Sequence, residues 1–143
     1  MLRLLGQFSF FGSRARIERF AAVASIPGAV IRRVGSKRKI PTADSWCYSS
    51  PWYRFRLESI DEELRDYMLA HARLGDALAV PDEEMQYAFF TLCPVDQSSR
   101  EALACVLSRE TLQVLSRLGV AFQIAPASVM PDAPFWREQA VAS

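Results

Sequence analysis

The sequence predicts a single α+β domain, with a single-layer, largely antiparallel sheet of about five strands and two to three helices packed on one face. Three observations support this class. Apolar residues alternate in short segments, as in strands with one buried face. Longer segments between them place apolar residues at helical spacing. The length of 143 residues and a hydrophobic content of 50% fit one domain with its own core.

The first part of the chain predicts a strand, a helix and then two or three strands. Apolar residues alternate from Leu2 to Phe10. Ser13 can cap a helix whose inward stripe begins at Ile17 and which ends at Pro27-Gly28. The following strands are expected at 29–34, 46–48 and 53–57, with a polar turn at 35–39 and a break at 49–51.

The clearest predicted element is a second helix that starts after Ser59. Ser59 and Glu62 have the spacing of a capping box, in which each side chain satisfies a backbone N–H group. The acidic residues of the first turn suit the positive end of the helix dipole. The segment ends at Pro81. Its apolar stripe runs through Ile60, Leu64, Met68, His71, Leu74 and Leu78.

The last part of the chain predicts a central strand, a third helix and a final strand. Residues 85–92 are apolar on both faces, as in the middle of a sheet. Residues 100–107 fit either a helix or a strand. Ser108 can cap a helix that ends at Gly119, with Leu112, Leu115 and Leu118 inward, before a strand at 120–124. The domain is therefore 1–125, and the Pro-containing tail 126–143 either packs on it or is loose.

Several local motifs resemble a known family. They are Phe8-Ser-Phe-Phe-Gly12, Ile26-Pro27, the basic stretch Arg32 to Arg38, Trp46-Cys-Tyr-Ser49 and the capped segment from Ser108 to Ile124. Together they resemble the bacterial domain-of-unknown-function family numbered four-two-seven-nine, over residues 7 to 125. The resemblance implies a small cytoplasmic bacterial domain with no established reaction. It also suggests an immunity protein, because some similar small α+β proteins are encoded beside secreted toxins.

Composition narrows the class of protein. No apolar run approaches the roughly 18 residues of a membrane span. The first residues imitate a signal peptide only faintly, because Gln7 and Ser9 interrupt the apolar stretch. Cys47, Cys93 and Cys105 are widely spaced and form no CxxC pair, which fits reduced thiols. We therefore expect a cytoplasmic protein with no membrane association.

Charge is divided sharply along the chain. Residues 1–56 contain eleven Lys/Arg and two acids, a net charge of +9, whereas residues 57–143 contain six Arg and fourteen acids, a net charge of −8. The total is +1. Such asymmetry bears on partners rather than on fold. Because strands from both halves are expected in one sheet, part of each charge should be used inside the molecule.

The acidic residues at the start of the second helix are the first candidate site. Five carboxylates occur in nine residues, more than helix capping requires, although a solvated helix end would also explain them. Complementary charge accelerates association between proteins. We expect a non-enzymatic protein-binding protein, most specifically an immunity protein that occludes a toxin's active site, with Trp52 or Trp136 as anchors. The acidic candidates are Glu58, Asp61, Glu62, Glu63 and Asp66.

A basic segment is the alternative site. Five cations in eight residues could bind phosphates around a turn at Gly35-Ser36, and nearby tryptophans could stack on bases. The net charge of the domain argues against this nucleic-acid or nucleotide-binding function, and a solvated turn would also explain the segment. The alternative anion-binding residues are Arg32, Arg33, Lys37, Arg38, Lys39, Trp46 and Trp52.

Enzymatic and metal chemistry have little support in the sequence. One histidine and three separated cysteines do not make a zinc motif, so no metal or other cofactor is expected. No Walker A motif, dinucleotide fingerprint or Gly-x-Ser-x-Gly elbow occurs. His71 lies on the apolar stripe of the second helix and is expected to be a core or boundary residue. A third interpretation, an enzyme that pairs Cys47 or Cys105 with His71, stays open.

Overall fold

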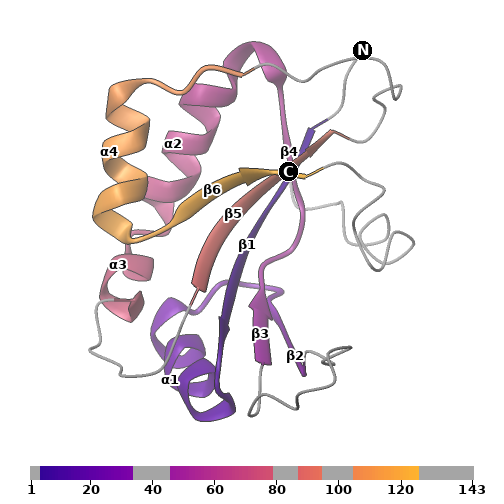
Figure 1. Cartoon of the computed structure of the whole chain (residues 1–143), viewed down its shortest axis with the longest axis vertical. Coiled ribbons are helices and arrows are strands. Elements are labelled where there is room, and N and C mark those ends of the chain that lie inside the picture. The colour runs from indigo at the N-terminus through magenta and orange to yellow at the C-terminus, as the bar shows by residue number, and fades with distance from the viewer. Residues whose placement is uncertain (1–3, 34–45, 79–86, 95–104, 126–143) are drawn as a thin grey trace, which may run out of the picture.

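The structure is a computed structural model that describes residues 4–33, 46–78, 87–94 and 105–125 (Figure 1). These residues form one mixed sheet of six strands and four α-helices. The predicted α+β class is therefore confirmed. The structure has one strand more than the five expected, and the helices exceed the expected two to three. The tail 126–143 and residues 100–104 lie outside the described ranges, and Cys105 to Leu107 belong to neither a helix nor a strand.

The sheet is built around its first strand. This strand is antiparallel to three others, and the only parallel pair among the described strands is β5–β6. The prediction of a largely antiparallel sheet is therefore confirmed. The order across the sheet is β2-β3-β1-β5-β6, with β4 also paired to β1. The strands are β1 (Leu4–Gly12), β2 (Val30–Arg33), β3 (Trp46–Ser49), β4 (Tyr53–Phe55), β5 (Tyr87–Pro94) and β6 (Ala121–Ile124).

The helices lie on one side of the sheet, as predicted (Figure 1). Phe8 pairs with Phe90 and Phe10 pairs with Tyr48, so these residues project from the same face. Phe20 of the first helix stacks on Phe10 with ring centroids 4.2 Å apart, which places the core between this face and the helices. The helices are α1 (Arg14–Ala24), α2 (Ile60–Ala70), α3 (Arg73–Leu78) and α4 (Arg109–Leu118), and a 3-10 turn at Leu57–Ser59 precedes α2.

Local capping signals place most helix ends correctly. The Ser13 hydroxyl accepts the Arg16 N–H at the start of α1, and the Ser108 hydroxyl accepts the Thr111 N–H at the start of α4. Gly119 ends α4 in the left-handed conformation with φ of 76°. This conformation costs glycine little because it has no Cβ atom. The signals succeed because each depends on residues within one helical turn.

The predicted second helix is wrong in its length. It breaks at His71 into α2 and α3, although its apolar stripe continues at helical spacing. The break allows α3 to contact both α1 and α4. A Cβ at Gly75 would lie 3.0 Å from Leu118 Cδ2, and the Ala77 carbonyl accepts a hydrogen bond from Arg16 at 2.7 Å. These partners are distant in sequence, so periodicity alone could not reveal the break.

Two finer predictions are also wrong. The Ser59 side chain makes no capping bond to the backbone of α2, and its hydroxyl instead donates to Glu63 at 2.7 Å. The predicted capping box of Ser59 and Glu62 is therefore absent. Ser59 instead bonds to the side chain of Glu63, the residue that follows Glu62. Leu112, predicted to point inward, is 51% exposed, and Thr111 is buried at the helix interface instead. Thr111 is tolerated there because its hydroxyl donates to the Asp61 carbonyl.

Candidate functional site

The five predicted acidic residues lie at the start of α2, but they do not form one uniform patch. Asp61 and Glu63 are half-buried, whereas Glu58, Glu62 and Asp66 are exposed. Asp61 and Glu63 have defined partners within the protein. The acidic candidates therefore divide into two structural carboxylates and three that face solvent.

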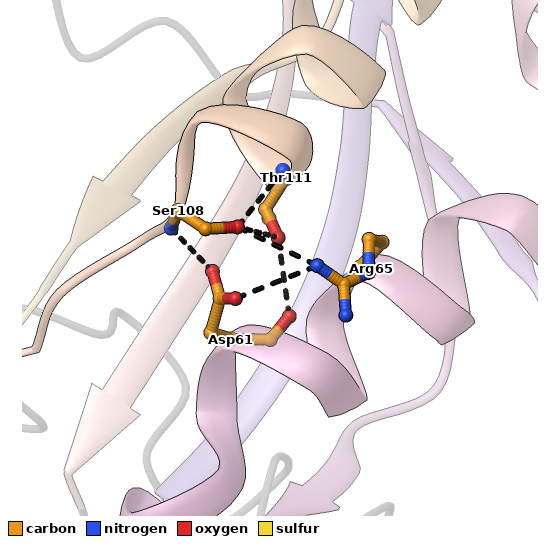
Figure 2. Close-up of polar contacts among 4 residues, drawn as sticks. All are labelled: Asp61, Arg65, Ser108 and Thr111. Carbon is orange, nitrogen blue, oxygen red and sulfur yellow. Dashed lines mark hydrogen bonds and ion pairs between the residues drawn. The ribbon is translucent and has the colours of Figure 1, made fainter.

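Asp61 joins α2 to the start of α4 (Figure 2). Its carboxylate accepts the Ser108 N–H at 2.5 Å and lies 3.6 Å from Arg65 Nη1. Its backbone carbonyl accepts the Thr111 hydroxyl at 3.3 Å. A backbone N–H at a helix start lacks a partner within its own helix, and an anion there also suits the helix dipole. Asp61 therefore acts as part of the cap of α4, and its carboxylate is not available to a partner protein in the way that was predicted.

The same contacts set the ionisation of Asp61. Partial burial opposes the charged form, but hydrogen bonds from the Ser108 N–H, the Thr111 and Ser108 hydroxyls, and the charge of Arg65 outweigh it. The pKa of the Asp61 carboxyl is therefore held below its usual value. The structure thus favours an ionised Asp61 wherever the helices are packed together.

Removing the Asp61 carboxylate should destabilise the fold measurably. We expect Asp61→Ala to cost about 1–2 kcal/mol in free energy of unfolding, because the start of α4 loses a charged acceptor. Urea denaturation of the purified protein measures this cost. Glu62→Ala is the matched control, since the neighbouring Glu62 is exposed and should change stability little. Equal losses in the two variants would contradict the role given to Asp61.

The pH dependence of stability should follow the same carboxylate. Its pKa is lower in the folded state, so this contribution is present above the unfolded pKa, about 4 for an aspartate. It is lost as the pH falls through the folded pKa, because the unfolded chain then binds the proton more readily. Urea denaturation at a series of pH values should therefore show a flatter acid limb for Asp61→Ala than for the unaltered protein.

Glu63 caps the turn that precedes α2. Its Oε2 accepts the Arg56 N–H at 3.0 Å and the Ser59 hydroxyl at 2.7 Å, and its Oε1 lies 3.6 Å from Arg56 Nε. Arg56 and Glu63 come from the basic and acidic halves of the sequence. Among ion pairs between described residues, this pair is the one that joins the two halves. Glu63 is therefore also occupied within the fold.

The remaining three carboxylates form what we call the acidic stripe, Glu58, Glu62 and Asp66. They follow one another at intervals of four residues across the 3-10 turn and α2, which places successive side chains on neighbouring parts of the same surface. Within the described part of the chain, none of the three forms an ion pair. Like charges four residues apart repel each other by a few tenths of a kcal/mol, so the acidic stripe gives the fold no evident stability.

An exposed leucine adjoins the acidic stripe. Leu69 follows Asp66 by three residues on α2 and is 52% exposed. The sequence prediction did not include Leu69. Its position outside the apolar stripe of the predicted helix was the signal that could have indicated its exposure. The surface of α2 therefore combines carboxylates with one large apolar side chain.

The two arginines of the alternative basic site do not share a face. Arg32 and Arg33 are both exposed on β2, but Arg32 lies opposite Cys47 and Arg33 lies opposite Trp46 in the β3 register. Consecutive strand residues point to opposite faces of a sheet. These two cations therefore cannot grip one phosphate together from the strand. Lys37, Arg38 and Lys39 lie outside the described residues.

The tryptophans give the basic site little stacking surface. Trp52 is only 3% exposed, so its predicted role as a base-stacking platform or as an interface anchor is wrong. The Arg14 guanidinium lies 5.3 Å from the ring centroid of half-buried Trp46. That contact occupies part of the one described tryptophan that a base could reach. Trp136, the other predicted anchor, lies outside the described residues.

The described cysteines have poor surroundings for nucleophilic catalysis. Burial raises the pKa of all three thiols, that of Cys93 to about 11. Cys47 and its strand neighbour Tyr48 project from opposite faces, and Tyr48 contacts Phe20 on the helix side. His71 packs on Tyr67, also on the helix side. The sheet therefore separates Cys47 from His71.

His71 and the other possible ligands in the described part of the chain do not gather into a metal site. His71 is half-buried, as expected, and burial lowers the pKa of its imidazole. Among the described residues, no group of three or more His, Cys, Asp or Glu side chains is placed to hold a metal ion. No described helix is long and apolar enough to cross a membrane.

Comparisons with protein-family models, curated proteins and solved structures find no match to this chain. The resemblance to the domain-of-unknown-function family stays a prediction.

Proposed function

We propose that this chain is a non-enzymatic binding protein that presents the acidic stripe to a basic surface of a partner protein. The observation behind this proposal is that Glu58, Glu62 and Asp66 are exposed and form no ion pair with a described residue. Asp61 and Glu63 have partners within the fold, so these three are the members of the five-residue candidate set that can contact a partner protein. Leu69 adds an apolar contact beside them.

The specific form that we propose is an immunity protein acting in the cytoplasm. Enzymes that act on nucleic acids or nucleotides bind phosphate through basic sites, and an acidic surface can occlude such a site. Complementary charge also speeds the encounter and fixes its orientation. The family resemblance supports this form, and the separation of Cys47 from His71 supports a non-enzymatic role. The partner would be a toxin with a basic active site.

Charge reversal of the acidic stripe should abolish binding without unfolding the protein. The probe is the product of the adjacent gene, co-expressed with this chain, with binding measured by co-purification and by titration. We expect the triple variant Glu58→Lys, Glu62→Lys, Asp66→Lys to weaken binding by about 100-fold or more, because three attractive contacts become repulsive. Association with the unaltered protein should also slow as salt concentration rises.

The matched control changes three exposed acids on the other helices. The variant Glu18→Lys, Asp76→Lys, Glu110→Lys alters the net charge by the same amount, and we expect it to bind almost as tightly as the unaltered chain. Equal losses in the two triple variants would show that only net charge matters and would reject the acidic stripe as the site. Failure of the unaltered chain to bind at micromolar concentrations would count against the immunity function.

A further inference from the structure

The two edges of the sheet differ in charge. Among the described strands, β2 ends the order of the sheet on one side and β6 ends it on the other, while β4 pairs only with β1. Each exposes an isoleucine to a similar extent, 43% for Ile31 and 44% for Ile124. However, β2 contains Arg32 and Arg33, whereas Ala121–Ile124 contains no charged residue. Charged side chains on an edge strand discourage pairing with another strand, so β2 is protected in a way that β6 is not.

The outer edge of β6 offers a defined set of backbone groups. The Ala125 N–H donates to the Leu92 carbonyl at 3.0 Å, so it points toward β5. Backbone groups alternate in direction along a strand, so Gln123 also points toward β5, while Phe122 and Ile124 point outward. No backbone hydrogen bond joins this outer edge to another described residue. Phe122 and Ile124 therefore each present a backbone donor and a backbone acceptor that no other described residue pairs.

The side chains of β6 are arranged so that the strand can pair with itself. Phe122 and Ile124 lie beside Phe90 and Leu92 and project from the helix-covered face, whereas Gln123 projects from the opposite face and donates to the Thr91 hydroxyl at 2.8 Å. A two-fold axis through Gln123 would place Phe122 of each copy opposite Ile124 of the other. Aromatic and β-branched residues form favourable cross-strand pairs.

We propose that β6 binds β6 of a second copy of this chain in antiparallel orientation, and that the sheet continues across the resulting dimer. Phe122 and Ile124 of each copy would donate and accept the connecting hydrogen bonds. Charge favours this occupant, because the neutral strands bring no like charges together. The corresponding pairing of β2 with itself would bring arginines together. This surface is separate from the acidic stripe on α2.

Sedimentation equilibrium of the full chain tests the dimer. We expect a reversible rise toward twice the chain mass through the micromolar range, since a short strand makes a small interface. Ile124→Lys should raise the dissociation constant at least about tenfold, because it places two lysines near the axis. Ile31→Lys, the same substitution at an equally exposed isoleucine on the other edge, should leave the dissociation constant within about twofold of its original value.

Amide exchange of the unaltered protein provides a test that does not depend on a variant folding. The Phe122 and Ile124 amides should exchange more slowly in concentrated than in dilute solution, while the Gln123 amide, directed at β5, should be protected in both. A monomer at every concentration would overturn the proposal. Persistence of the dimer in Ile124→Lys, or its loss in Ile31→Lys, would also overturn the proposal. The same holds if the exchange rates of the Phe122 and Ile124 amides do not depend on protein concentration.

Discussion

Replacement of Arg16 by alanine is expected to cost about 2–4 kcal/mol in free energy of unfolding, which is typical of removing a large, fully buried side chain. Arg16 lies on α1 and is only 1% exposed. Its Nη2 donates to the Ala77 carbonyl at 2.7 Å, and its guanidinium lies 5.2 Å from the Phe10 ring centroid. The variant would leave a cavity and remove the bond that joins α1 to the last turn of α3.

Arg14 provides the matched control for Arg16. It lies on the same helix, but its side chain is 63% exposed and pairs with Glu18 at 3.1 Å. Exposed ion pairs contribute little, so Arg14→Ala should cost about 1 kcal/mol or less. Denaturation by urea, followed by circular dichroism, compares the two variants. Similar losses for both would show that the burial of Arg16 does not determine its contribution.

Replacement of Gly6 by alanine should destabilise the protein by about 1–3 kcal/mol through overpacking. Gly6 lies in the middle of the sheet on β1, under two aromatic rings. A Cβ atom there would lie 2.5 Å from Phe55 Cε2 and 2.5 Å from Phe90 Cζ. Those rings contact each other edge to face at 5.6 Å, and Tyr67 packs against both, so neither can move away freely.

Gly12 is the control for the steric effect, because it lies on the same strand. Its added Cβ would come no closer than 3.4 Å to Arg16 Cγ, so Gly12→Ala should change stability by only a few tenths of a kcal/mol. The double variant Gly6→Ala, Phe55→Leu should lose less stability than the two single variants together, because the smaller side chain relieves the contact. Strict additivity would argue against the clash. Thermal and urea denaturation measure each variant.

Two arginines of the charge-rich first half, Arg14 and Arg16, show why composition did not identify the cation that is buried in the core. Arg14 and Arg16 are separated by one residue in the sequence and belong to the same helix. Arg14 is exposed, whereas Arg16 lies in the core because α3 packs over it and the Ala77 carbonyl accepts a hydrogen bond from its guanidinium. That carbonyl is 61 residues away in sequence. No local pattern distinguishes the two positions.

The five candidate carboxylates lie at the start of α2, as their positions in the sequence implied, but only three of them face solvent. The sequence places five carboxylates in one short segment. It does not show that the neighbouring residues Asp61 and Glu62 differ in their exposure to solvent. Asp61 faces the start of α4 and binds Ser108, 47 residues away, while Glu62 faces solvent. The exposure of Leu69 and the burial of Trp52 were missed for the same reason. Each depends on which distant segment covers the side chain.

By itself, the sequence determined the α+β class, the alternating strands and the helix caps at Ser13, Ser108 and Gly119, because these depend on interactions within a turn or a strand. Tertiary structure alone decided the break at His71, the exposure of the acidic stripe and the parallel edge strand β6. The physical reason is that burial and pairing join residues tens of positions apart. Local periodicity shows that an apolar face of a helix or strand must be buried. Only the packed fold shows which distant segment covers it.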